Sequence, residues 1–265
     1  MAAHYNCYAL DPEGRPLFNE KGQPDLVRGD IYVSVSQVLS QESAGDFLTT
    51  WLLNTFGGQP EPLKAYKAYM ERVSDLGTRL HHYIECDLKG EDYSGEWAAD
   101  MEPGVQSWID FRGKHVIETV DSERILFSKK LRVAGTMDMA LRIDGKLYVA
   151  DLKTGTVYNK AFVQLSAYSH MYHEMELLKE PAELLVLGGN DSKTKIADGG
   201  AVVMHTMDSK FGGRVSQNDL FAHFMCLRHV WFMNNLKVRK FEPVIKGMQE
   251  ALDPMIERFK AQFQA

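Results

Sequence analysis

The stretch Val133-Ala-Gly-Thr-Met-Asp-Met-Ala-Leu-Arg-Ile-Asp-Gly-Lys-Leu-Tyr-Val-Ala-Asp-Leu-Lys153 holds two β-prone runs on either side of Asp144-Gly145. An Asp-Gly pair between two such runs is a strong signal for a two-residue hairpin loop, and a loop of that length fixes the register of the strands. Across such a loop, the numbers of two facing residues add up to the same total as 144 and 145. Ile143 therefore faces Lys146. The sequence predicts an antiparallel pair at the centre of the fold.

Continuing this register inward places Asp138 directly opposite Asp151. Side chains across an antiparallel pair have Cβ atoms about 4.5–5.5 Å apart, so two bare carboxylates there repel each other. Lys153 lies two residues beyond Asp151 and therefore on the same face. Two carboxylates at this spacing also suit a hard divalent cation such as Mg²⁺ or Mn²⁺. A bound metal lowers the pKa of a water, which the lysine can then hold or deprotonate.

The alternative is a surface hairpin in which both aspartates are solvated and Lys153 only screens them. The apolar residues Val149, Ala150 and Leu152 instead indicate an interior strand. Burial makes unpaired carboxylates costly, which favours the metal-site interpretation.

Apolar periodicity and turn residues predict the rest of the order. Helices are expected at about 44–56, 63–89, 105–111, 160–178 and 217–235 with a last one from about Pro243, and further strands at 124–128, 183–187 and 201–207. This order predicts an α/β or α+β fold with a central mixed sheet flanked by helices. We expect one domain over residues 1–265, made of an N-terminal strand-and-helix elaboration (1–62), a core (63–208) and C-terminal helices (209–265).

Four motifs carry a resemblance to a known family. Gly135-Thr-Met-Asp138, Asp151-Leu-Lys153-Thr-Gly155 and Gln164-Leu-Ser-Ala-Tyr168 resemble motifs II, III and IV of the PD-(D/E)XK nuclease superfamily, in its RecB-like and phage-exonuclease branch. Upstream, Gly77-Thr78-Arg-Leu-His81-His-Tyr-Ile-Glu85 is similar to the GTxxHxxxE motif of that branch. The resemblance covers residues 77–168 and implies a restriction-endonuclease-like αβββαβ core.

The resemblance also implies roles for individual residues. The implied metal ligands are His81, Asp138, Asp151 and the backbone carbonyl of Leu152, with Glu85 orienting His81 or holding a second metal or its water. Lys153 would position the attacking water, and the helix face of Gln164 and Tyr168 would contact this lysine and the DNA backbone. Glu123 matches a further acidic position of the family loosely. The nucleic-acid contacts expected in addition are Thr78, Arg79, Thr154, Lys129, Lys130 and Arg132.

The charge balance, with 30 Lys and Arg against 36 Asp and Glu, gives a net charge of −6 and excludes a protein that coats nucleic acid through bulk positive charge. This net charge is an average over segments of opposite charge. Residues 123–160 carry eight basic and four acidic residues, and residues 207–240 carry six and two, so each segment has a local charge of +4. Residues 85–121 hold ten acidic and three basic residues, a charge of −7. We expect the two basic segments to line a groove that follows phosphates.

The cysteine content and the absence of certain motifs narrow the class of protein. Three scattered cysteines, Cys7, Cys86 and Cys226, provide neither a disulfide framework nor the four ligands of the iron–sulfur cluster found in some relatives. No GxxxxGK[ST] sequence is present, so we expect no ATP dependence. The lack of a long apolar run favours a cytoplasmic protein, in the host cell if the gene is phage-encoded, with no membrane partner.

These observations lead to the hypothesis of a stand-alone Mg²⁺-dependent deoxyribonuclease. By family analogy we expect an exonuclease that acts on DNA ends in phage-type recombination, replication or repair, with a single-strand annealing or other recombination protein as a candidate partner. The alternatives are a non-catalytic protein that retains the nuclease fold and acts on recombination or defence proteins, and a restriction-like endonuclease.

Overall fold

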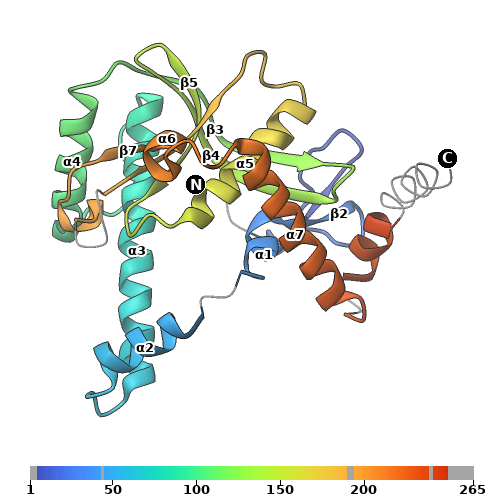
Figure 1. The fold of residues 1–265 in the computed structure, drawn as a ribbon, viewed down its shortest axis with the longest axis horizontal. Coiled ribbons are helices and arrows are strands. Elements are labelled where there is room, and N and C mark those ends of the chain that lie inside the picture. Colours follow the sequence, from blue (N-terminus) through green and yellow to red (C-terminus); the bar gives the residue numbers. More distant parts are fainter. Residues whose placement is uncertain (1–4, 43–44, 190–193, 239–240, 250–265) are drawn as a thin grey trace.

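The computed structural model describes residues 5–42, 45–189, 194–238 and 241–249. A mixed sheet of seven strands forms the centre, and helices pack on both of its faces (Figure 1). The strands are β1 (Cys7–Leu10), β2 (Asp30–Ser34), β3 (Ile117–Ser128), β4 (Val133–Ile143), β5 (Lys146–Lys153), β6 (Glu183–Gly188) and β7 (Val203–Thr206). The helices are α1 (Val35–Leu39), α2 (Gly45–Phe56), α3 (Pro62–Lys89), α4 (Glu102–Arg112), α5 (Asn159–Glu174), α6 (Met207–Phe211) and α7 (Gln217–Asn235), with 3₁₀ turns η1 (Ala99–Met101) and η2 (Ile196–Asp198). Residues 242–249 are also helical.

The strand order is β1-β2-β4-β5-β6-β7, and β3 pairs with β4. The β2–β4 and β5–β6 pairs are parallel, and the other pairs are antiparallel. The mixed sheet flanked by helices agrees with the predicted fold class. Because β1 and β2 belong to this same sheet, the N-terminal elaboration is continuous with the rest of the fold.

Alternating side chains of β4, β5 and β6 build a separate apolar core on each face of the sheet. On one face Val149 and Val186 pack with Phe162 of α5 and Trp231 of α7. On the other face a second core joins Ile84 of α3 and Trp108 of α4 to the sheet, with Leu141, Ala150 and Leu185 from the strands. The sheet is therefore the middle layer of three, with α1, α5 and α7 on one side and α3 and α4 on the other.

Helix α3 is longer than the body that it packs on, and with α2 it forms an arm that projects away from the sheet (Figure 1). Six consecutive residues, from Met70 to Asp75, are exposed, so this part of the helix has no packed face. At the tip, Trp51 and Phe56 of α2 pack against Tyr66 and Tyr69 of α3. The ring cluster holds the two helices of the arm together.

Two predicted boundaries were wrong. Helix α5 ends at Glu174 rather than Leu178, because Glu176 adopts a left-handed conformation (φ 56°) and the amide of Leu177 donates to the carbonyl of Tyr172. This is the hydrogen-bond pattern of a Schellman motif. Strand β3 begins at Ile117 rather than Arg124, since a bulge between Thr119 and Asp121 interrupts its alternation. The last predicted helix is described only to residue 249.

Candidate active site

The hairpin at Asp144-Gly145 has the predicted register. Both turn residues have positive φ values, 49° and 85°, as a type I′ turn requires. Ile143 pairs with Lys146, and the ladder continues to Met139–Ala150, which is its last pair. The next residues inward, Asp138 and Asp151, therefore lie where the two strands separate.

The edge of β4 explains this separation. Strand β3 follows one edge of β4 along its whole length, so β2 and β5 must share the other edge. Strand β2 pairs there with Val133 and Ala134, and β5 pairs with 139–143. No described strand pairs with positions 135–138 on that edge. The sheet thus opens between β4 and β5, at Asp138.

The two carboxylates are almost removed from solvent. Asp151 is only 2% exposed, and the side chain of Asp138 is 12% exposed, with its Oδ2 3.5 Å from the amide nitrogen of Leu152. Burial raises the pKa of Asp138 well above its usual value, and the negative charge of Asp151 raises it further. The fold therefore holds Asp138 in a place that disfavours its charged form.

Lys153 supplies the positive charge nearest to this pair. Its Nζ donates a hydrogen bond to Asp151 Oδ1 at 2.9 Å and lies 2.7 Å from Oδ2. Burial opposes the charged form of Lys153, but the charges of Asp151 and Asp138 outweigh it, so the lysine pKa is raised. Although Oδ2 is within ion-pair distance, it is the one buried side-chain oxygen or nitrogen among the described residues that has no hydrogen bond. A carboxylate oxygen has more than one lone pair, so Oδ2 can accept a further cation besides Lys153.

His81 comes to the same place from α3, with Nδ1 3.9 Å from Asp138 Oδ2. Glu85, one turn later, forms an ion pair with Lys89 at 2.5 Å and lies 3.8 Å from His82 Nδ1. Lys89 lowers the pKa of Glu85 against the opposing effect of its burial. Glu85 thus has partners on α3 itself, whereas His81 reaches the carboxylates.

Gln164 and Tyr168 of α5 lie on the side of the sheet that carries Asp151. Gln164 Nε2 donates to the Tyr168 hydroxyl at 3.3 Å, and the tyrosine ring is buried. A Cβ atom at Gly135 would lie 2.7 Å from the ring, so only glycine lets α5 approach β4 this closely. Burial raises the pKa of Tyr168 well above its usual value, and the nearby charge of Asp138 acts in the same direction. The hydroxyl therefore stays protonated.

A second close approach links α3 to the end of β5. A Cβ atom at Gly77 would lie 3.1 Å from Thr154 Oγ1, the residue after Lys153. Glycine inside a helix costs about 1 kcal/mol relative to alanine, and this contact gives the reason for it. Gly77 thereby sets the helix that carries His81 against the strand that carries Lys153.

The structure does not bring all predicted nucleic-acid contacts to the site. Thr78 is exposed beside it, but Arg79 is held by Asp75 and Asp100. Thr154 lies beside Lys153. The turn residues Lys129, Lys130 and Arg132 are six or more positions before Asp138, which corresponds to about 20 Å of strand.

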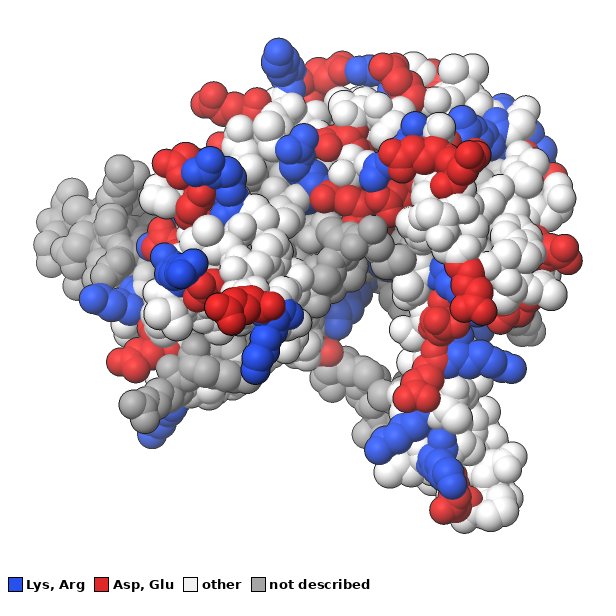
Figure 2. Space-filling view, turned by 180° about the vertical axis from the view of Figure 1, so that it is seen from behind, with Lys and Arg blue, Asp and Glu red and all other residues white. Residues whose placement is uncertain are grey.

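The turn is nevertheless where the two basic segments meet. Buried Arg228 of α7 donates its Nε hydrogen to the Leu131 carbonyl at 2.8 Å. Lys129 donates to the carbonyl of Pro12, and Arg132 lies 3.4 Å from Asp30. Figure 2 shows blue and red side chains intermixed over the face in view, without a continuous basic surface there. The predicted groove that joins both basic segments to the carboxylates is therefore not evident on this face.

Glu123 is better placed than its loose motif match indicated. It lies opposite Asp138 in the β3–β4 register, between the pairs Ser122–Met139 and Arg124–Met137, and its backbone has a φ of 51°. A positive φ is uncommon for a glutamate and costs about 1–3 kcal/mol. The charge of Glu123 contributes to the raised pKa of Asp138. Acidic residues thus stand at adjacent positions on three neighbouring strands.

The acidic residues around Asp138 suit a divalent cation that keeps some of its water ligands. Among the described residues, no three His, Cys, Asp or Glu side chains form a complete ligand group. Mg²⁺ does not require such a group, because it is usually bound by one or two carboxylates plus waters. Asp138 and Asp151 meet this requirement, and Asp151 Oδ2, which has the Lys153 ion pair but no hydrogen bond, can act as a ligand.

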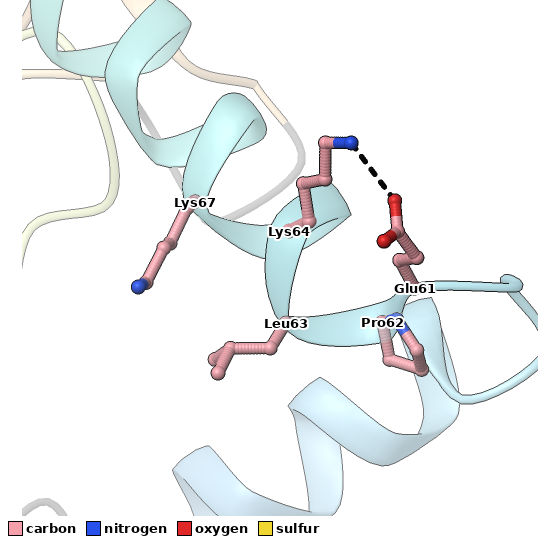
Figure 3. A pocket seen from close by; sticks show the side chains of 5 residues that line it. All are labelled: Glu61, Pro62, Leu63, Lys64 and Lys67. Carbon is pink, nitrogen blue, oxygen red and sulfur yellow. Dashed lines mark hydrogen bonds and ion pairs between the residues drawn. The ribbon is translucent and has the colours of Figure 1, made fainter.

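Two cavities are relevant. One of about 900 Å³ is lined by Lys153 and Gln164 and continues along α1 and the start of α5. A smaller one of about 400 Å³ lies at the tip of the arm, where Lys64 pairs with Glu61 and Lys67 points away from both (Figure 3). Of these two, only the larger cavity is lined by Lys153, the ion-pair partner of Asp151.

A scan against protein-family models and a search of curated proteins find no match to this chain. No helix among the described residues is long and apolar enough to cross a bilayer. Any assignment of function therefore depends on the motifs and on the geometry of the residues around Asp138.

Proposed function

We propose that the chain is a metal-dependent nuclease with a PD-(D/E)XK-type core, which hydrolyses phosphodiester bonds of DNA. The observation that carries this proposal is the buried pair Asp138 and Asp151 beside Lys153, with one carboxylate oxygen that has no hydrogen bond. The order α4-β3-β4-β5-α5-β6 supports the proposal, since it follows the αβββαβ order of that core.

Asp138 and Asp151, with the Leu152 carbonyl and His81, would hold Mg²⁺ or Mn²⁺. The metal would supply a Lewis acid for the phosphate and lower the pKa of a bound water. A cation there also removes the electrostatic problem of the metal-free site, because it neutralises two carboxylates that otherwise repel each other.

Lys153 has two tasks in this mechanism. In the metal-free protein its ammonium group neutralises Asp151 at 2.7–2.9 Å. During hydrolysis it orients the attacking water and stabilises the charge that develops on the phosphate, an electrostatic contribution that is usually the largest in such sites. Gln164, hydrogen-bonded to Tyr168, presents its amide to the cavity that Lys153 also lines.

The test is hydrolysis of linear DNA by purified protein with and without Mg²⁺. We expect Asp151→Asn and Lys153→Ala to abolish cleavage, whereas Asp144→Asn, in the exposed turn of the same hairpin, retains it. Equal cleavage by Asp151→Asn and the wild type would refute the site. Closed circular, 5′-blocked, 3′-blocked and single-stranded DNA then separate exonuclease from endonuclease activity.

The non-catalytic alternative makes an opposite prediction for the metal. A binding protein without activity has no need for a cation at Asp138 and Asp151, so a calorimetric titration with Mg²⁺ or Mn²⁺ would show no binding. Saturable binding that is lost in Asp151→Asn supports the enzyme.

A further inference from the structure

The cavity of about 900 Å³ extends beyond the residues that the proposed hydrolysis uses. Lys153 and Gln164 line one part of it, while Ser36 and Ser40, at the start and end of α1, line another. Ligand pockets range from about 300 to 1,000 Å³, so the space suits a molecule of nucleotide size in addition to the scissile phosphate. The cavity is therefore a candidate substrate subsite.

The lining has more positive than negative charge. Lys160 makes no hydrogen bond or ion pair within the described part of the chain, and Lys210 Nζ donates to the Val157 carbonyl at 3.3 Å. Glu42 is the one carboxylate among the described lining residues, and it lies 3.8 Å from His223 Nε2. Two lysines without carboxylate partners in a concave site are suited to a phosphate group.

An aromatic ring lies next to these lysines. Tyr158 lines the cavity and is 62% exposed, so much of its ring is accessible. Stacking of a base on an aromatic side chain contributes about 1–3 kcal/mol and does not depend on the base identity. Tyr158 is also the N-cap residue of α5 and makes no side-chain capping bond, so the first amides of the helix add a favourable dipole for an anion.

We propose that this cavity binds one nucleotide, with its phosphate at Lys160 and Lys210 and its base against Tyr158. The inference rests on the proposed nuclease function, in which the bound unit is either the terminal nucleotide of a strand or the released mononucleotide. Both sources present the same chemistry, a phosphate joined to a nucleoside. A nucleotide held there would place an adjoining phosphodiester near Lys153, which lines the same cavity.

The experiment measures binding of dAMP to the full chain without divalent metal, so that no hydrolysis contributes to the signal. We expect saturable binding that weakens at least about tenfold in Lys160→Gln and further in Lys160→Gln/Lys210→Gln, because each change removes a charge-assisted contact. Lys67→Gln, in the smaller cavity at the arm tip, is the matched control and should bind dAMP like the wild type. A thermal melt confirms that the variants fold, and Lys160→Gln alone removes no hydrogen bond or ion pair within the described part of the chain.

The ligand series separates the parts of the proposal. Deoxyadenosine and inorganic phosphate should each bind more weakly than dAMP, and Tyr158→Ala should weaken dAMP but not phosphate. Equal binding of deoxyadenosine and dAMP, or of phosphate and dAMP, would overturn the proposal, as would unchanged dAMP binding in the double lysine variant. A short oligonucleotide with a terminal phosphate that competes with dAMP identifies the strand end as a source, and competition only by mononucleotides identifies the product.

Failure of this inference is distinguishable from failure of the nuclease proposal. DNA hydrolysis with no saturable dAMP binding leaves the nuclease and removes the subsite. Lysine-dependent dAMP binding without hydrolysis under any metal condition leaves the subsite and removes the nuclease.

Discussion

Replacing Asp138 by asparagine should make the metal-free protein more stable. Burial and the negative charge of Asp151 both disfavour the charged form of Asp138. Two like charges about 5 Å apart repel by about 3 kcal/mol at an effective dielectric constant of 20. Attraction to Lys153 offsets part of this repulsion. An asparagine oxygen can still accept from the Leu152 amide, as Asp138 Oδ2 does at 3.5 Å. We expect a net gain of about 1–2 kcal/mol, or an increase in Tm of about 2–5 °C.

The raised pKa of Asp138 determines how the stability gain of Asp138→Asn depends on pH. The folded-state pKa of Asp138 is raised above its unfolded value, so the wild type is destabilised above the folded pKa and the penalty disappears below the unfolded one. The advantage of Asp138→Asn should therefore be largest at neutral to alkaline pH and vanish in acid. Urea denaturation in the presence of a chelator from pH 4 to 8.5 measures it, with Asp92→Asn, at an exposed carboxylate, as the matched control.

Addition of Mg²⁺ should reverse the order of stability. A cation bound to both carboxylates stabilises the folded wild type by mass action, whereas Asp138→Asn loses a ligand and gains little. If Asp138→Asn is less stable than the wild type without metal at pH 8, or if its stability relative to the wild type does not change with pH, the description of a strained carboxylate pair is wrong.

Three further substitutions test other parts of the structure. Gly135→Ala places a Cβ 2.7 Å from the buried Tyr168 ring, so we expect a loss of about 1–3 kcal/mol in urea denaturation, and wild-type stability would show that α5 moves away freely. Trp108→Phe removes the 2.6 Å hydrogen bond from the indole to Asp87 and should cost about 1–3 kcal/mol in the same measurement; a neutral effect would mean that water replaces the indole. Trp51→Ala removes a ring that contacts the other three rings of the arm cluster, so limited proteolysis should cut the arm faster while the main unfolding transition is unchanged. An equal cleavage rate would contradict the packing described.

Local rules predicted the centre of the fold well because the Asp-Gly turn leaves little freedom. A two-residue loop permits one register, and the pairs from Ile143–Lys146 to Met139–Ala150 are confirmed. Helix α3 likewise ends at Lys89, where Gly90 adopts the left-handed conformation that terminates helices. Both features depend on residues within a few positions of each other, which a sequence displays directly.

Other features depend on residues whose backbone conformation cannot be inferred from their residue type. Glu176 stops α5 and Glu123 lies within β3, each with a positive φ that is usual for glycine and rare for glutamate. The separation of β4 and β5 at Asp138 requires β2 as a third neighbour of β4, about a hundred residues earlier in the chain. The Asp100 partner of Arg79 also emerges only from packing, whereas Asp75 and Lys89 are i,i+4 partners of Arg79 and Glu85 within α3.

The hairpin also limits where residues can be inserted into or deleted from this protein. One residue inserted within 139–143 or 146–150 would turn one carboxylate toward α4 while the other still faces α5, because strand side chains alternate between faces. An extra residue at Asp144-Gly145 only lengthens the loop and leaves both carboxylates on their face. Insertions and deletions during the evolution of this protein should therefore collect at the turn, about 20 Å from the carboxylates, and be excluded from the strands beside it.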